Sequence, residues 1–350
     1  MSWTIGPRVG SLNNRLSVSS KHNNKNLENS PYVFEASALV GPPHKLVKIT
    51  NDTTKELSGI INNTLSEFLR VQVVDEYNNP ISNHSVRFEV LSRRQADGGS
   101  LDGKVDSVKV KETNSNGLVY VQFTLGKEAG VRINRVQVST YVPGTGQHLV
   151  NSPLLFEISG RSTNATQMAK EDGDGQTGTV GKNLPRPIKV KAMDQHGNKV
   201  EGQPINFRIE LNNGDLPSEI GALGFGTTTD TTVDTDNQGV ASIVWRMGHK
   251  TGEYTLTATS TDLDGSPATF TATAEADVTH PDSSTILVTP SSQIVSEGDE
   301  RSMVRVTLMD RFKNPVQNKA VSLEATGDCQ VVQPSGSTDE NGQTVGYIYS

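Results

Sequence analysis

The segment VVDEYNNPISNHSVRFEV, which begins at Val73, contains the pattern that decides the fold. The same pattern returns as KAMDQHGNKVEGQPINFRIE from Lys191 and as TLMDRFKNPVQNKAVSLEA from Thr307. Measured between the aspartates of the three copies, the spacing is 119 residues (75 to 194) and then 116 residues (194 to 310). A period of this length is that of a small domain, so the sequence predicts a tandem array of similar domains.

Apolar and polar residues alternate on both sides of each aspartate, which is the period of a strand with one buried face. The residues between the alternating runs are rich in Asn, Gly and Pro, which favour turns. Each copy therefore predicts two strands joined by a turn. The expected inward positions are Leu69, Val71, Val73, Val86, Phe88 and Val90 in the first copy, Ile188, Val190, Ala192, Ile205, Phe207 and Ile209 in the second, and Val304, Val306, Leu308, Val321, Leu323 and Ala325 in the third.

A second marker follows in each copy, a turn glycine before another strand. It occurs in NSNGLVYVQFTLG from Asn114, in TDNQGVASIVWRMG from Thr235 and in TDENGQTVGYIYS from Thr338. In the third copy the apolar set of this strand is displaced by one residue, and such a slip exchanges the two faces of a strand. The expected inward positions are Val119, Val121 and Phe123, then Ala241, Ile243 and Trp245, then Val345, Tyr347 and Tyr349, with Trp3 in a position equivalent to Phe123 and Trp245.

The composition indicates an all-β chain. Of its 350 residues, 33% are hydrophobic, 32 are Gly and 16 are Pro, and no segment keeps a helical period, which favours β-sandwiches. The net charge is −7 and no basic run occurs, so we expect no nucleic-acid partner. No apolar stretch approaches the roughly 20 residues that span a bilayer, so we expect no transmembrane segment. The single cysteine, Cys329, cannot form an internal disulfide.

The segment DGDGQTGTVGKNLPRPIKVKAMDQHGNKVEGQPINF, from Asp172 to Phe207, resembles the bacterial immunoglobulin-like group 1 repeats of intimin- and invasin-type surface adhesins. The resemblance rests on a glycine-rich entry, Leu-Pro-x-Pro, the Asp-x-x-x-Asn turn and the later turn glycine, and weaker copies extend it over essentially the whole chain. It implies immunoglobulin-like sandwiches that serve as an extracellular rod or spacer at a cell surface, in some members with a terminal binding tip.

The two ends of the chain match different parts of one repeat. WTIGPRVGSLNNRLSVSS from Trp3 matches FTLGKEAGVRINRVQVST from Phe123, and PYVFEASALVG from Pro31 matches PLLFEISGRS from Pro153. We therefore expect residues 1–42 to form the last strands of an immunoglobulin-like domain. Residues 43–163 and 164–278 are expected to form complete domains, and residues 279–350 the first part of a domain that lacks its last strands.

These two incomplete sandwiches are complementary, which predicts donor-strand complementation between copies and a head-to-tail filament. The expected polymer interface comprises Trp3, Ile5, Leu16, Val18, Val33, Phe34, Val345, Tyr347 and Tyr349. The end of one copy and the start of the next would overlap at this junction, because Ile348 and Trp3 both align with Phe123. This overlap counts against a junction without displaced residues. Alternatively, the partner is a neighbouring repeat of a longer chain. Two other functions stay open: an adhesin module that binds a protein or glycan, with Tyr141 and Phe225 as weak candidates, and a phage or virion decoration protein.

Chemical motifs are scarce. No histidine pair has metal-ligand spacing and no G-x-S-x-G or phosphate-binding loop occurs, so we expect no enzymatic activity and no cofactor. Carboxylates near two predicted domain junctions suggest a weak Ca²⁺ site, with solvated linker charge as the alternative. They are Glu171, Asp172 and Asp174, and then Asp277 and Asp282. Asn51, Asn62, Asn83 and Asn164 begin N-glycosylation triplets, which we interpret as chance matches.

Overall fold

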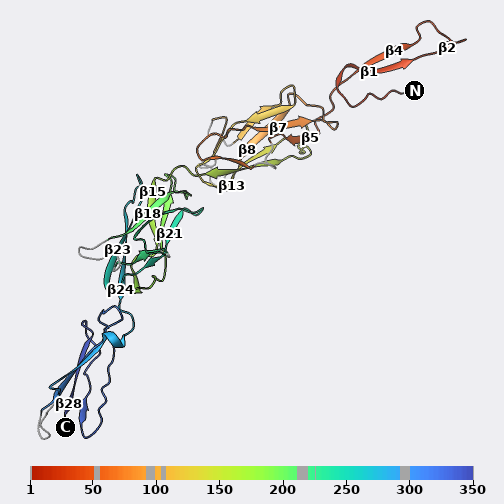
Figure 1. Ribbon diagram of the computed structural model, residues 1–350. Coiled ribbons are helices and arrows are strands. Elements are labelled where there is room, and N and C mark those ends of the chain that lie inside the picture. The colour runs from red at the N-terminus through yellow and green to blue at the C-terminus, as the bar shows by residue number, and fades with distance from the viewer. Residues whose placement is uncertain are drawn as a thin grey trace. The chain divides into compact units, whose positions relative to one another are not determined.

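The computed structural model describes residues 2–50, 56–91, 99–103, 108–210, 220–224, 226–291 and 300–349. The chain divides into two compact units, Met1–Thr163 and Asn164–Ser350, and each is described by itself (Figure 1). Over the described ranges the regular structure is β-strand, apart from one turn of 3-10 helix at Pro281–Ser283. No helix in the described part of the chain is long and apolar enough to cross a membrane.

Unit 1 contains a complete two-sheet sandwich. One sheet has the order β10-β8-β13-β14-β6, the other has the order β11-β7-β5, and the short pair β12-β9 lies beside them. The strands are β5 (Lys45–Lys48), β6 (Leu57–Ile60), β7 (Leu69–Val74), β8 (Ser85–Val90), β9 (Ser100–Leu101), β10 (Val108–Glu112), β11 (Leu118–Val121), β12 (Phe123–Thr124), β13 (Gly130–Ser139) and β14 (Leu154–Arg161).

Unit 2 contains a second sandwich of the same topology. Its sheets have the orders β16-β24-β23-β18-β20 and β15-β17-β21, with the pair β19-β22. The strands are β15 (Gln167–Asp172), β16 (Gln176–Thr179), β17 (Ile188–Met193), β18 (Pro204–Ile209), β19 (Ala222–Leu223), β20 (Asp230–Asp234), β21 (Val240–Ile243), β22 (Trp245–Arg246), β23 (Gly252–Thr259) and β24 (Ala268–Glu275). The prediction of an all-β chain of tandem immunoglobulin-like sandwiches is confirmed.

The cores of both sandwiches contain the residues that the alternation places inward. Leu69, Val71 and Val73 are fully buried on β7, and Phe207 is fully buried on β18. The strands that follow the turn glycines bury Phe123 and Trp245 completely. Each such aromatic or aliphatic side chain contributes about 1.5–3 kcal/mol of transfer free energy.

The remaining strands of unit 1 form a separate hairpin. Strand β1 (Gly10–Val18) pairs with β4 (Tyr32–Ala38), and β2 (Lys21–His22) pairs with β3 (Lys25–Asn26) near its tip. We call β1 and β4 the N-terminal hairpin. Trp3, expected in a core, precedes this hairpin in irregular structure and is 39% exposed. The expected burial of Trp3 is therefore not found in the single chain, because no described sheet of unit 1 covers this residue.

The remaining strands of unit 2 form one sheet, the C-terminal sheet, with the order β25-β26-β28-β27. They are β25 (Thr285–Thr289), β26 (Ser302–Thr307), β27 (Gln330–Val332) and β28 (Gln343–Tyr349). Strand β26 buries Val304 and Val306 as predicted. The predicted strand through Val321, Leu323 and Ala325 is absent, and these residues are irregular. Its counterparts β8 and β18 are held by ladders on both sides, whereas no described strand flanks this segment.

The face of β28 also differs from the expectation. Thr344 and Gly346, which lie on one face of the strand, are buried. Tyr347, which follows Gly346 and lies on the opposite face, is 38% exposed. Thr344 lies two residues after Gly342, as Val119 lies two residues after Gly117, so the turn glycine sets the phase of this strand. The expected inward set of Val345, Tyr347 and Tyr349 therefore lies on the other face.

Candidate functional site: unpaired sheet faces and domain joints

The N-terminal hairpin has the geometry of the β13–β14 hairpin. Both are interrupted by a register shift, between Gly10 and Asn14 in one and between Gly130 and Asn134 in the other. The same ion pair crosses the strands, as Arg15–Glu35 at 2.8 Å and Arg135–Glu157 at 3.3 Å. Corresponding hydrogen bonds recur, from Leu12 N to Ser37 Oγ at 2.9 Å and from Arg132 N to Ser159 Oγ at 2.9 Å. Residues of β1 thus correspond to residues 120 positions later in β13.

The two hairpins differ in the exposure of one face. Val136, Val138 and Phe156 are fully buried between the sheets of the sandwich. Their counterparts Leu16, Val18 and Phe34 are 38%, 52% and 48% exposed. The N-terminal hairpin therefore presents an apolar face of the kind that its counterpart buries in a core.

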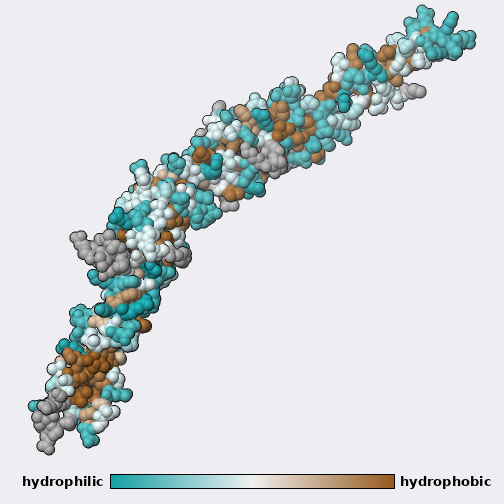
Figure 2. All heavy atoms as spheres, in the orientation of Figure 1, coloured by the Kyte–Doolittle hydropathy of each residue, from teal (hydrophilic) through white to brown (hydrophobic). Residues whose placement is uncertain are grey.

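The C-terminal sheet exposes apolar residues on its edge strand β25. Ile286 is 70% exposed and Leu287 is 54% exposed. Figure 2 shows apolar residues gathered over this part of unit 2. Ile286 pairs with Val306. In the complete sandwiches the corresponding position is a lysine, whose ammonium lies over a phenylalanine of the facing sheet. Lys48 Nζ lies 4.4 Å from the ring centroid of Phe156, and Lys170 Nζ lies 5.2 Å from that of Phe270.

The structure divides the predicted polymer interface into groups. Leu16, Val18 and Phe34 share the apolar face of the hairpin. Val33 lies on the opposite face, where its counterpart Leu155 is also exposed. The remaining predicted residues are Trp3 and Ile5 in exposed irregular structure, and Val345, Tyr347 and Tyr349 on the outer face of β28.

The repeated Asp-x-x-x-Asn turn has a role that the sequence did not reveal. In unit 1, Asp75 Oδ1 accepts hydrogen bonds from the backbone of Tyr77 and Asn79, which closes the turn. Asp75 Oδ2 accepts from Gly41 N at 3.1 Å, and Asn79 Nδ2 donates to Pro7 O at 2.9 Å. The turn therefore binds main-chain groups of the segment that precedes its own domain.

The corresponding turn in unit 2 makes the same contacts. Asp310 Oδ2 accepts from Asp277 N at 3.1 Å, and Asn314 Nδ2 donates to His249 O at 2.8 Å. Thr251 N donates to Asn314 Oδ1 at 3.1 Å. His249 and Pro7 occupy equivalent positions, four residues after Trp245 and Trp3. We call each set of contacts a joint, and because it uses main-chain atoms it tolerates different side chains in the preceding segment.

Side chains add to the joint of unit 2. The rings of His249 and Phe312 stack with centroids 4.1 Å apart, and Lys182 Nζ lies 2.8 Å from Asp277 Oδ1. The hydrogen bond from Lys182 is the main cause that lowers the pKa of Asp277. At the joint of unit 1, burial alone would raise the pKa of Asp75, but the hydrogen bonds from Asn79, Gly41 and Tyr77 together lower it.

Three carboxylates of the predicted Ca²⁺ site, those of Glu171, Asp172 and Asp174, each have a cationic partner. Asp174 lies 2.6 Å from Lys170 Nζ and Glu171 lies 3.8 Å from Lys191 Nζ, while Asp172 pairs with Arg186. Within the described residues, no group of three or more His, Cys, Asp or Glu side chains is arranged to hold a metal ion. The Ca²⁺ site stays a prediction, which a calcium titration of the unfolding temperature tests.

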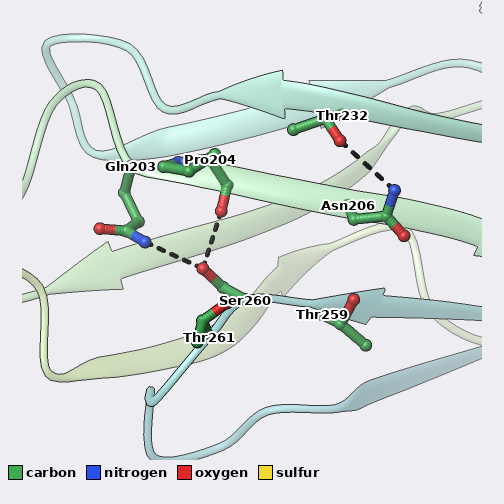
Figure 3. A pocket seen from close by; sticks show the side chains of 7 residues that line it. All are labelled: Gln203, Pro204, Asn206, Thr232, Thr259, Ser260 and Thr261. Atoms are coloured by element: carbon green, nitrogen blue, oxygen red, sulfur yellow. Dashed lines mark hydrogen bonds between the residues drawn. The ribbon is translucent and has the colours of Figure 1, made fainter.

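A shallow pocket of about 400 Å³ lies at one end of the second sandwich (Figure 3). Ser260 Oγ accepts a hydrogen bond from Gln203 Nε2 at 2.9 Å and donates to Pro204 O at 2.7 Å. None of the seven lining side chains is ionisable, and the only hydroxyl groups belong to Ser and Thr without a neighbouring base in the lining. The pocket therefore lacks the groups for nucleophilic or acid–base catalysis.

Of the glycosylation triplets, Asn62, Asn83 and Asn164 are exposed. Asn51 lies outside the described residues, as does Phe225, one of the two weak candidates for adhesion. The other candidate, Tyr141, is 43% exposed and packs on His148 with ring centroids 4.4 Å apart.

No family model matches the chain. Among solved structures, the chain is similar to FdeC, described as a broadly conserved Escherichia coli adhesin, with a TM-score of 0.57, 16% identity, and coverage of 89% of this chain and 90% of that one. It is also similar to InvD of Yersinia pseudotuberculosis, with a TM-score of 0.42, 18% identity, and coverage of 76% and 73%. For invasin, described as a bacterial integrin-binding protein, the TM-score is 0.42, the identity 15%, and the coverage 87% of this chain and 54% of that one. The similarity to FdeC shows a common fold.

Proposed function

We propose that this chain is a non-enzymatic, extracellular structural protein of a bacterial-type cell surface, in which tandem immunoglobulin-like sandwiches form a rod. Three features support this proposal: the tandem sandwiches, the joints that fasten successive segments within each unit, and the resemblance to surface repeats. The fold shared with FdeC agrees with this location. The mechanism is mechanical, because the reach and stiffness of such an array depend on the number of domains and on the joints between them.

The finer part of the proposal is that copies join head to tail into a filament. The observation that carries it is the exposed face of the N-terminal hairpin, formed by Leu16, Val18 and Phe34, whose counterparts are core residues. The hairpin of one copy would supply strands of the sheet that faces the C-terminal sheet of the next copy, by strand complementation. Because the two surfaces of such a contact differ, repeated addition gives an open filament.

Light scattering and electron microscopy of the chain over a concentration series test this assembly. We expect the mean mass to rise with concentration and filaments to form. A mass that stays monomeric up to the highest soluble concentration would contradict self-assembly and would favour neighbouring repeats of a longer chain as partners.

An adhesin module is the second candidate, favoured by the similarity to FdeC, which is described as an adhesin. Adhesion would use loops at one end of a sandwich, such as that of Tyr141. Binding of the chain to cultured host cells tests it, with Tyr141→Ala as the variant. Saturable binding that the variant loses would support adhesion, and the absence of saturable binding would count against it.

A further inference from the structure

The segment that follows the third Asp-x-x-x-Asn turn corresponds to a central strand of the complete sandwiches. Leu323 lies 13 residues after Asp310, as Phe88 lies 13 residues after Asp75. Phe88 belongs to β8, which pairs with β13 on one side and β10 on the other. Residues 320–326 alternate like β8 but form no strand in the described structure.

A side chain occupies the main-chain groups that a strand partner would use. Gln333 Oε1 accepts from Leu323 N at 2.8 Å, and Gln333 Nε2 donates to Leu323 O at 2.7 Å. The side chain of Leu323 lies close against Gly346, because a Cβ added at Gly346 would be 2.5 Å from Leu323 Cδ1.

In the first sandwich Leu91 N donates to Arg135 O of β13, so the main chain of Phe88, three residues earlier, faces β10 instead. The primary amide of Gln333 therefore binds Leu323 on the edge that corresponds to β10, opposite to the edge that corresponds to β13.

The first sandwich supplies a template for that neighbouring strand. In it, β13 lies antiparallel to β8 with Val138 opposite Phe88, Gln137 opposite Glu89 and Val136 opposite Val90. Strand β1 corresponds to β13 with an offset of 120 residues, and it keeps the same register shift and cross-strand ion pair. Residues 323–325 correspond to residues 88–90 with an offset of 235.

We propose that β1 of a second copy pairs antiparallel with residues 323–325, on the edge of this segment opposite to Gln333. Transferred from the template, the register places Val18 opposite Leu323, Ser17 opposite Glu324 and Leu16 opposite Ala325. This inference rests on the proposed head-to-tail assembly and specifies its partner surface.

The same register explains the exposed isoleucine of the edge strand. Phe34 corresponds to Phe156, which in the first sandwich lies under the ammonium of Lys48. Ile286 occupies the position of that lysine. In the joined copies, Phe34 therefore packs on Ile286, and an apolar pair replaces the cation–π pair of the complete sandwich. Two side chains that are 48% and 70% exposed in the single chain would thus be buried.

Disulfide trapping between two full-length chains tests the register. Both carry Cys329→Ser, one also carries Ser17→Cys, and the other also carries Glu324→Cys. Directly opposite positions of an antiparallel pair bring the Cβ atoms within about 4.5–5.5 Å, which is close enough for a disulfide after small adjustments. We expect a mixed dimer on a non-reducing gel, in at least tenfold higher yield than with Ala325→Cys in place of Glu324→Cys. The control residue is one position away, on the opposite face of the strand.

Light scattering of the same mixtures tests the head-to-tail assembly separately from the strand register, which are the two levels of the proposal. Assembly with trapping at residue 324 supports both levels. Assembly without trapping at residue 324, or with equal trapping at residue 325, overturns the register and leaves the assembly standing. Absence of both assembly and trapping overturns the head-to-tail proposal itself.

Discussion

Trp245 is fully buried in the second sandwich, and its indole Nε1 finds no hydrogen-bond partner among the described residues. We expect Trp245→Ala to lower the free energy of unfolding by about 3–5 kcal/mol, because it removes apolar contact and leaves a cavity. Trp245→Phe should lower it less, since it also removes an unpaired buried donor. Urea denaturation followed by circular dichroism measures both. Trp3→Ala, at a 39% exposed position, is the control and should change the value by less than about 0.5 kcal/mol.

The carboxylate of Asp75 is expected to make the free energy of unfolding of unit 1 depend on pH. Its pKa in the folded chain is below the ordinary value of 3.8, so the stability it contributes is complete above that value and is lost as the pH falls through the folded pKa. We expect the wild type to lose more free energy of unfolding than Asp75→Asn when the pH is lowered from about 5 to about 2. Urea denaturation at each pH measures this difference. Parallel curves for the two proteins would show that the carboxylate does not contribute in this way.

At the scale of the element, the joint of unit 2 depends on one short turn. Asn314→Ala removes the side-chain acceptor of Thr251 N and the donor to His249 O. One hydrogen bond contributes about 1 kcal/mol, so we expect the Thr251 amide to exchange hydrogen roughly fivefold faster. Hydrogen exchange measured by NMR provides the test. The control is Asn341→Ala, an exposed position in another turn of the same unit. If Thr251 keeps its protection in Asn314→Ala, the stacking of His249 on Phe312 holds the joint instead.

Sequence patterns predicted the strands that have partners and failed where partners are missing. The alternation at Leu69, Val71 and Val73 identified a buried face, because β7 lies between β5 and β11. The same alternation near Leu323 predicted a strand that is absent, since periodicity reports which face is apolar but not whether a ladder exists on either side. On β28 the apolar character of Tyr347 and Tyr349 led to the prediction of the wrong inward face. Counting from the turn glycine Gly342, as in the first copy, identifies the buried face correctly.

The joints were visible in the sequence only as a recurring Asp-x-x-x-Asn turn. A local turn explains the bonds within five residues, as between Asp75 and Asn79. The contact of Asn79 with Pro7 spans 72 residues of sequence, and nothing in the local pattern specifies it. When the three copies are aligned, the only sign of this contact in the sequence is that the Asp-x-x-x-Asn turn occurs in every copy.

At the scale of the whole molecule, each unit combines a complete sandwich, an intact joint and an incomplete sandwich. The joint of unit 1 binds Pro7, which precedes β1, and Gly41, which follows β4. The joint of unit 2 binds residues that follow β22 and β24. Both joints are satisfied within one chain, whereas the apolar face of the N-terminal hairpin is not covered. Under the proposed assembly, contact between copies would therefore be made inside a sandwich, where burial of apolar surface is greatest, and the joints would need no partner copy.

Charge placed on the apolar face of the hairpin tests that assembly in the full chain. Leu16→Asp and Phe34→Asp each put a carboxylate where the proposed contact excludes water, and burial of an unpaired charge is strongly unfavourable. We expect the concentration for half-maximal assembly, measured by light scattering, to rise more than about tenfold, which corresponds to about 1.4 kcal/mol. The unfolding temperature of the single chain should stay the same, because Leu16 and Phe34 are 38% and 48% exposed. Val33→Asp, on the opposite face, is the matched control and should assemble like the wild type. Equal effects of Val33→Asp and Phe34→Asp would assign the change to net charge rather than to the face that packs.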